Sequence, residues 1–201
     1  MFTPFNFHQN YTLENERVKL MPLDGNNSTY LKHFSINEPN IWKYSLVPVA
    51  GEENFKKYVS NSLLSREEET AYPFIVFDKK TNEYAGSTRF YDIQLNNLTL
   101  QLGYTWYGGK FQGTGLNKNC KYLLLQFAFE TMGVERVEFR ADYNNKRSIA
   151  AMKGIGCTIE GILRSNVPNA NGGRRDSIIL SVLRQEWEER VKKNLKEKME
   201  K

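Results

Sequence analysis

The stretch WYGGKFQGTG, residues Trp106–Gly115, decides the organisation of the chain because it joins segments with different hydrophobic periods. Before it, Leu98–Trp106 alternates apolar and polar residues, which predicts a strand. After it, apolar residues from Leu116 onward recur at three- and four-residue steps until Gly133, which predicts an amphipathic helix. A helix start carries unpaired N–H groups and positive dipole character, and glycines let those groups approach an anion closely. The turn is therefore predicted to bind a phosphate or pyrophosphate.

Two common nucleotide-binding motifs do not fit this turn. The G-x-G-x-x-G pattern of dinucleotide-binding folds needs a third glycine, and that position is Lys118. The P-loop needs Gly-Lys-Ser/Thr at the helix start, which is absent. Neither nucleotide fold is favoured.

The rest of the chain alternates predicted strands and helices around this turn. Strands are predicted at Arg17–Leu23, Pro73–Asp78, Glu83–Gln94, Leu98–Trp106, Arg136–Tyr143, Cys157–Leu163 and Ser177–Leu183. Helices are predicted at Ser28–Ile36, Glu52–Arg66, Lys146–Met152 and Glu186–Lys201, besides the one that follows the turn. Hairpins in the middle and a strand-helix-strand passage at the turn predict an α+β fold with a mixed, mostly antiparallel sheet.

Length and composition indicate one globular domain. The chain has 201 residues, of which 40% are hydrophobic and 25% charged, so we expect a single domain over residues 1–201. Residues 1–16 form an N-terminal arm and residues 186–201 a charged helix, whose apolar stripe is expected to dock on the body. No apolar run approaches the roughly 20 residues of a membrane span, and no leader pattern is seen. We therefore expect a cytoplasmic protein without membrane partners.

The chain has few residues of the kinds and spacings that bind metals or nucleic acids. Cys120 and Cys157 are the only cysteines, and neither has metal-ligand spacing to His8 or His33, so no metal site and no disulfide is expected. The net charge is +5, but the C-terminal tail of Arg190–Lys201 supplies most of it and the body is nearly neutral. Direct nucleic-acid binding is therefore disfavoured. The sequence leaves the oligomeric state open, including a homo-oligomer.

The turn resembles the coenzyme-binding segment Q/R-x-x-G-x-G/A of the GCN5-related N-acetyltransferase (GNAT) superfamily. Gln112 and Gly115 match its first two fixed positions, whereas Asn117 replaces the small third residue. Four further segments look like the RimJ/RimL branch of the family. These are Asn145-x-x-Ser148, Met152-x-x-Ile155-Gly156-Cys157, Glu160-Gly161-Ile162-Leu163-Arg164 and Gly172-x-x-Arg175-Asp176. The resemblance spans nearly the whole chain, in the family's order, and implies a GNAT-like sheet with helices on both faces.

This resemblance implies acetyl-CoA as the cosubstrate and assigns residues to it. Backbone amides of the turn would hold the pyrophosphate, strand residues would pair with the pantetheine arm, and Asn145 would contact the coenzyme or simply cap its helix. The turn residues are Gln112, Gly113, Thr114, Gly115, Leu116 and Asn117, and the strand residues are Leu102, Gly103, Tyr104 and Thr105.

The implied reaction is direct attack of an amine on the thioester, which needs a base, an oxyanion site and an acid. Backbone N–H groups of Leu98–Trp106 would stabilise the oxyanion. Ser148 is the candidate general acid by resemblance, the alternative being a first-turn hydroxyl of a short helix. The family's carboxylate position falls near Val167, which cannot accept a proton. The base is left unassigned among Glu138, Asp142, Asp92 and Asp176, and a chain of water molecules is a further route for the proton.

The sequence thus predicts an acetyl-CoA-dependent N-acetyltransferase acting on a protein N-terminus or a small-molecule amine. Two alternatives stay open: an antibiotic or polyamine acetyltransferase, and a non-catalytic CoA-binding or interaction module. Acceptor choice is expected to depend on the loops at Asn37–Val49 and Ser165–Gly173.

Overall fold

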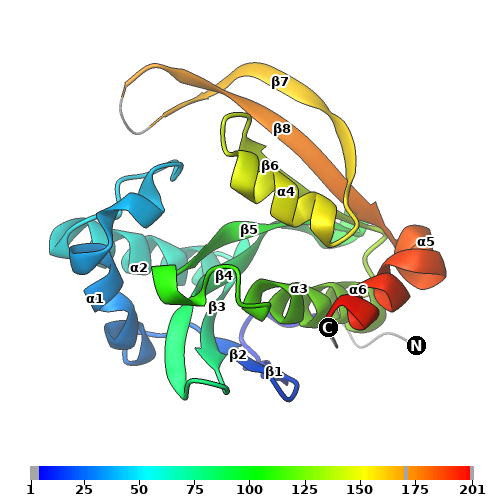
Figure 1. The fold of residues 1–201 in the computed structure, drawn as a ribbon, viewed down its shortest axis with the longest axis horizontal. Coiled ribbons are helices and arrows are strands. Elements are labelled where there is room, and N and C mark those ends of the chain that lie inside the picture. The colour runs from blue at the N-terminus through cyan, green and yellow to red at the C-terminus, as the bar shows by residue number, and fades with distance from the viewer. Residues whose placement is uncertain (1–4, 170–171, 200–201) are drawn as a thin grey trace.

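The computed structural model describes residues 5–169 and 172–199. Within them, eight strands form one sheet in the order β1-β2-β3-β4-β5-β6-β8-β7 (Figure 1). Strands β5 and β6 run parallel, and every other neighbouring pair is antiparallel. The predicted α+β class with a mixed, mostly antiparallel sheet is confirmed.

The elements have the following bounds. The strands are β1 (Leu13–Glu14), β2 (Val18–Pro22), β3 (Ala71–Asp78), β4 (Glu83–Gln94), β5 (Thr99–Tyr107), β6 (Arg136–Asp142), β7 (Thr158–Pro168) and β8 (Arg174–Leu183). The α-helices are α1 (Lys32–Asn37), α2 (Glu52–Glu67), α3 (Leu116–Gln126), α4 (Lys146–Gly154), α5 (Arg184–Glu186) and α6 (Lys192–Met199). Short 3-10 helices occur at η1 (Asn27–Leu31), η2 (Pro39–Trp42), η3 (Leu95–Asn97) and η4 (Gly109–Phe111), and π-helical turns at η5 (Phe127–Thr131) and η6 (Trp187–Val191).

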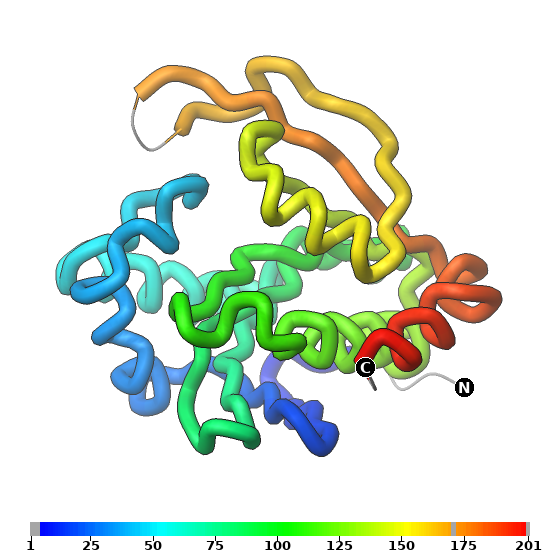
Figure 2. Tube along the Cα trace, viewed as in Figure 1, coloured from blue at the N-terminus to red at the C-terminus, as the bar shows by residue number. Residues whose placement is uncertain are grey.

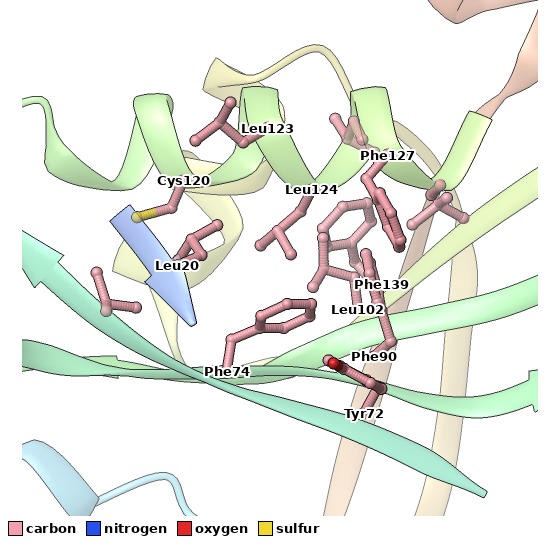
Figure 3. Close-up of a cluster of buried hydrophobic side chains, with 14 of the residues drawn as sticks. Leu20, Tyr72, Phe74, Phe90, Leu102, Cys120, Leu123, Leu124, Phe127 and Phe139 are labelled. Atoms are coloured by element: carbon pink, nitrogen blue, oxygen red, sulfur yellow. The ribbon is translucent and has the colours of Figure 1, made fainter. Parts of the chain in front are cut away.

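The main core lies between α3 and the sheet (Figure 3). Cys120 and Leu124 point from the helix toward Phe74 and Leu102 on the strands, and all four side chains are buried. Burying a side chain of leucine or phenylalanine stabilises a fold by about 1.5–3 kcal/mol. The apolar residues that recur at three- and four-residue steps in the sequence therefore form the face that fixes α3 on the sheet.

Helix α2 covers the opposite face. Tyr58 and Ser62 of α2 are buried there, and the Tyr58 hydroxyl accepts a hydrogen bond of 3.2 Å from Nε1 of Trp106 on β5. Helices on both faces of the sheet, as predicted, thus hold β5 between two layers.

The C-terminal helical segment docks on α3, as its apolar stripe predicted. Trp187, Val191 and Leu195 are buried, and Nε1 of Trp187 donates to Oε1 of Glu130 at 2.8 Å. The tube in Figure 2 shows this segment lying alongside α3. It begins at Arg184, two residues before the predicted start.

Two boundaries differ from the sequence prediction. Strand β7 runs on to Pro168, and β8 begins at Arg174, so the first part of the expected loop at Ser165–Gly173, Ser165–Pro168, lies in a strand. The register shifts between Leu163 and Val167, and Ser165 has φ of +50°, which marks a bulge. The bulge interrupts the alternation of apolar residues after Leu163. The polar residues there therefore predicted a turn, although the strand continues.

The N-terminal arm also contains structure that the sequence did not reveal. Its residues 1–4 lie outside the described residues, but Phe5 and Phe7 are buried against the core. Leu13–Glu14 pairs with β2 as the short strand β1. In the segment Asn37–Val49, predicted to be irregular, Pro39–Trp42 forms a 3-10 helix and buries Trp42.

Candidate functional site

Strands β5 and β6 separate shortly after they begin to pair. Their pairing covers three positions, the last joining Gln101 to Glu138. Beyond these residues β5 pairs with β4 alone and β6 with β8 alone, and Figures 1 and 2 show the two strands diverging. The facing edges of both strands therefore lack a strand partner for their backbone groups past this point. Helix α3 follows β5 and α4 follows β6, so both helices begin at the open end of this divergence.

The turn before α3 presents unpaired donors to solvent. Gly113 has φ of +78° and Gly115, the N-cap of α3, φ of +85°, and no atom lies within 4 Å of where a side chain would start at either residue. The backbone N–H groups of residues 113–117 find no acceptor within the described ranges, and the first bond of the helix runs from Lys118 N to Gly115 O at 3.1 Å. Together with the helix dipole, these unpaired N–H groups could hold an anion at the start of α3.

Side chains around the turn hold it in shape. Nε2 of Gln112 donates to the Tyr107 carbonyl at 2.7 Å, and Oε1 of Gln112 accepts from Arg147 on α4. Thr114 Oγ1 donates to the Phe111 carbonyl at 2.7 Å. The Asn117 side chain turns away from the N–H groups, since its Oδ1 accepts from the Tyr107 hydroxyl at 3.2 Å. Asn117 therefore does not obstruct the turn, although it is larger than the family's usual residue.

A cation that the sequence did not single out lies beside the turn. Arg17 donates from Nη2 to Asp78 Oδ2 at 3.0 Å, its Nε lies 2.9 Å from Asp78 Oδ1, and its Nη2 also lies 3.4 Å from Thr114 Oγ1. The Asp78 side chain is almost fully buried, so it fixes the guanidinium at this place. Arg17, just before β2, and Arg147 of α4 thus bring positive charge to the turn, an arrangement that favours a phosphate.

Asn145 and Ser148 open α4 at the other side of the divergence. Asn145 Oδ1 accepts from the Ser148 N–H at 3.1 Å, so Asn145 is the N-cap of the helix. The Ser148 hydroxyl has no hydrogen-bond partner in the parts of the chain that the structure describes, and the side chain is half-buried. It is therefore free to donate to a bound molecule.

The strand residues from Leu102 to Thr105 contain a bulge. Tyr104 has φ of +48°, and the register with β4 shifts at this point. Leu102 faces α3, Tyr104 faces the α2 side, where the Arg89 guanidinium stacks 4.3 Å from its ring, and Thr105 faces α3 again. A bulge leaves backbone groups unpaired and re-aims them, as an oxyanion site requires.

A second cation that the sequence analysis missed is Lys121 of α3. It is buried, and its Nζ donates to Thr105 Oγ1 at 2.7 Å. Burial lowers the pKa of Lys121 to about 8. A sequence signal existed, because Lys121 stands three and four residues before Leu124 and Leu125, which are both buried.

None of the four candidate bases is a free carboxylate. Glu138 is held by Arg136 at 2.8 Å and by Arg140 at 2.6 Å. The three aspartates each accept hydrogen bonds: Asp92 from Gln101 and Gln94, Asp142 from the Asn144 N–H, and Asp176 from the Ser165 N–H rather than from Arg175. The geometry favours no single base among them.

Residues 5–169 and 172–199 contain neither a cluster of metal ligands nor a membrane-spanning helix. No group of three or more His, Cys, Asp or Glu side chains there could hold a metal ion. No helix in these ranges has the length and apolar character to cross a bilayer.

Comparison with known proteins identifies the family. Residues 17–158 match the model of the acetyltransferase (GNAT) domain. A curated relative, YdaF of Bacillus subtilis (strain 168), named "Putative ribosomal N-acetyltransferase", is 30% identical over 103 residues. This match covers 51% of the chain and 55% of YdaF, so it spans little more than half of that protein's length.

Solved structures share the whole fold. A GCN5-related N-acetyltransferase from Brucella melitensis superimposes with a TM-score of 0.86 at 23% identity, over 98% of this chain and 89% of that one. RimL, a ribosomal alpha-N-protein acetyltransferase, gives 0.75 at 21% identity, covering 91% of this chain and 99% of its own. The microcin C7 self-immunity acetyltransferase MccE, solved with acetyl-CoA and AMP, gives 0.74 at 26% identity, covering 84% and 93%. The chain belongs to the GNAT family of N-acetyltransferases and is an acyltransferase with RimJ/RimL-like structural neighbours.

Proposed function

We propose that the protein transfers the acetyl group of acetyl-CoA to a primary amine, with a protein N-terminus as the acceptor that the site fits best. The observation that carries this proposal is the set of unpaired N–H groups at residues 113–117, beside the point where β5 and β6 separate. Membership in the family, and a structural neighbour solved with acetyl-CoA, support the coenzyme assignment.

The residues present fit the coenzyme. The turn from Gln112 to Asn117 would hold the diphosphate with backbone N–H groups, while Arg17 and Arg147 add positive charge. The unpaired edge of β5 at Leu102–Thr105 would bind the amide-containing pantetheine arm as a strand binds its neighbour. Asn145 sets the start of α4 by accepting from the Ser148 N–H, and the unpaired Ser148 hydroxyl would serve the same opening.

When bound, acetyl-CoA supplies an acetyl group activated as a thioester. The chain contributes backbone N–H groups of the β5 bulge near Tyr104, aimed at the oxygen on which negative charge develops. The Ser148 hydroxyl serves as the candidate acid. Because Glu138, Asp92, Asp142 and Asp176 are all engaged, we propose that the ammonium proton of the acceptor leaves through water rather than to one carboxylate.

Charged side chains on the α2 side of the sheet affect which class of amine would bind as the acceptor. Arg89 is 6% exposed, donates to Ser62, and has no carboxylate within ion-pair distance among the described residues. Arg175 is half-buried, donates to the Ser177 hydroxyl at 3.2 Å, and is only partly offset by Asp142. A polyamine or aminoglycoside would need acidic walls, whereas this face carries the buried Arg89 and the half-buried Arg175. The arrangement therefore favours a peptide N-terminus with a single positive charge over a polycation.

The proposal is tested in two stages with purified protein. Acetyl-CoA should raise the melting temperature, because a ligand that binds only the folded state stabilises it. Release of the free thiol is then measured on a panel of N-terminal peptides, spermidine and an aminoglycoside, and products are identified by mass spectrometry. We expect turnover on peptides and little on the polycations. Stabilisation without turnover on any amine would contradict the transfer reaction, and absence of stabilisation would contradict the coenzyme site.

A further inference from the structure

Lys121 is a buried ammonium group without a carboxylate partner among the residues that the structure describes. The residue is 5% exposed, and its Nζ donates to Thr105 Oγ1 at 2.7 Å and to Thr88 Oγ1 at 3.3 Å. The two threonine hydroxyls lie 2.8 Å apart and bond to each other. Burying a charge without an opposite charge is costly, so an apolar side chain at this position would give a more stable fold.

The ammonium group lies where β5 and β6 begin to separate. The last pair that joins the two strands is Gln101 with Glu138, Thr105 lies four residues farther along β5, and Phe139 directly follows Glu138 on β6. Lys121 Nζ contacts Thr105 and is 5.9 Å from the centre of the Phe139 ring. It therefore reaches the divergence from the side of α3, the helix whose start forms the anion site.

The groups that face Lys121 leave its charge uncompensated. From β4 and β5 it meets the hydroxyls of Thr88 and Thr105, and from β6 the ring of Phe139. The remaining neighbours are the thiols of Cys120 and Cys157, whose pKa values burial raises to about 12, so both are neutral near pH 7. Nothing in the described part of the chain acts as the counter-charge.

We propose that Lys121 places a positive charge beside the sulfur of coenzyme A and stabilises the thiolate that leaves during acetyl transfer. This inference rests on the proposed function. As the acceptor nitrogen forms its bond to the acetyl carbon, the carbon–sulfur bond breaks and its electron pair passes to sulfur. Lys121 faces this sulfur from α3 and lowers the energy of the negative charge, as a positive group does for any nearby thiolate. The acceptor ammonium loses two protons, one to water before the attack and one that passes through Ser148 to the sulfur, so the reaction releases one proton to solvent and no further reactant is needed.

The test measures the pKa of the thiol of bound coenzyme A, from the ultraviolet absorbance of the thiolate as the pH is raised. Wild-type protein is compared with Lys121→Met, which fits an apolar site, and with Lys118→Met. Lys118 lies one turn earlier on the same helix, with Nζ 3.4 Å from the Lys198 carbonyl, so its removal changes the net charge equally. We expect a thiol pKa about 1 to 3 lower in wild type and Lys118→Met than in Lys121→Met. We also expect a slower acetyl transfer in Lys121→Met alone.

The outcomes separate this inference from the function on which it rests. An equal thiol pKa in all three proteins, each with coenzyme A bound, would overturn the role of Lys121 and leave the coenzyme site standing. If wild-type protein binds no coenzyme A, the proposed function itself fails. Misfolding is checked by the melting temperature of ligand-free Lys121→Met, which should match or exceed that of wild type because a buried charge has been removed.

Discussion

Replacing Gly115 by alanine isolates the contribution of the turn to coenzyme binding. The residue has φ of +85° as the N-cap of α3, and an added Cβ would meet no atom of the protein within 4 Å. The new methyl group would thus occupy only the open space beside the N–H groups of residues 113–117. The methyl group therefore affects the fold only through backbone strain. It affects the ligand only by filling the space in front of these N–H groups.

The two effects differ in size and can be measured separately. A non-glycine residue in the left-handed region costs about 1–2 kcal/mol, which lowers the melting temperature of a chain of this length by roughly 2–8 °C. Loss of one hydrogen bond to a charged group costs about 1.5–3 kcal/mol, equivalent to a rise in the Kd for acetyl-CoA of about 10- to 150-fold. Isothermal titration calorimetry measures the Kd, and calorimetric melting measures the strain.

A control for ligand binding comes from Gly51, the N-cap of α2. It has φ of +88° and equally open surroundings, and it belongs to the helix on the other face of the sheet. Its ψ of 158° differs from the −12° of Gly115, so an alanine there is more strained than one at Gly115. Gly51→Ala should therefore lower the melting temperature without changing the Kd for acetyl-CoA. The reasoning is refuted if Gly115→Ala binds acetyl-CoA as tightly as wild type, or if Gly51→Ala weakens binding to the same extent.

Three further substitutions test individual side chains. Ser148→Ala should lower kcat about 100-fold or more and leave the melting temperature nearly unchanged, because the hydroxyl has no partner among the described residues; unaltered steady-state kinetics would dismiss Ser148 as the acid. Asn145→Ala should lower the free energy of unfolding by about 1 kcal/mol in urea titrations, since Ser148 N–H loses its acceptor, whereas Asn145→Asp should keep most of it; equal losses would argue against the cap. Burial lowers the pKa of Lys121 from 10.5 to about 8, so the unfolded chain binds more protons between these values and wild-type stability rises with pH there. The stability advantage of Lys121→Met, about 3 kcal/mol near pH 7, should therefore shrink as pH rises from 8 to 10.5, and a constant difference would contradict the buried ammonium.

The sequence predicted those parts of the fold in which periodicity and burial agree. The apolar steps from Leu116 to Phe127 gave α3, and the stripe of Trp187, Val191 and Leu195 gave the docked C-terminal segment. Where a bulge breaks the alternation of a strand, the predicted strand ended too early. Ser165, with φ of +50°, interrupts the pattern of β7, but the strand continues to Pro168. Strand β1 has only two residues, too few to show any period.

The site was predictable where chemistry depends on the backbone and less so where it depends on tertiary contacts. Glycines before a helix indicated the anion site at residues 113–117 from sequence alone. In contrast, Tyr104 is not a residue type that favours positive φ, so the bulge on β5 left no local signal. Arg17 reaches Thr114 from 97 positions away along the chain, and only the folded sheet brings the two together. Lys121 was overlooked because a lysine within a helix is ordinarily a surface residue.

The central claim is that the N–H groups at the start of α3 bind the diphosphate of acetyl-CoA, and amide NMR tests it most directly. Coenzyme A is titrated into ¹⁵N-labelled protein, and shifts are followed for every assigned backbone amide. If the diphosphate binds there, the amides of residues 113–117 show the largest shifts, all with one common Kd. Binding that leaves the chemical shifts of these amides unchanged while others move would contradict diphosphate binding at the start of α3.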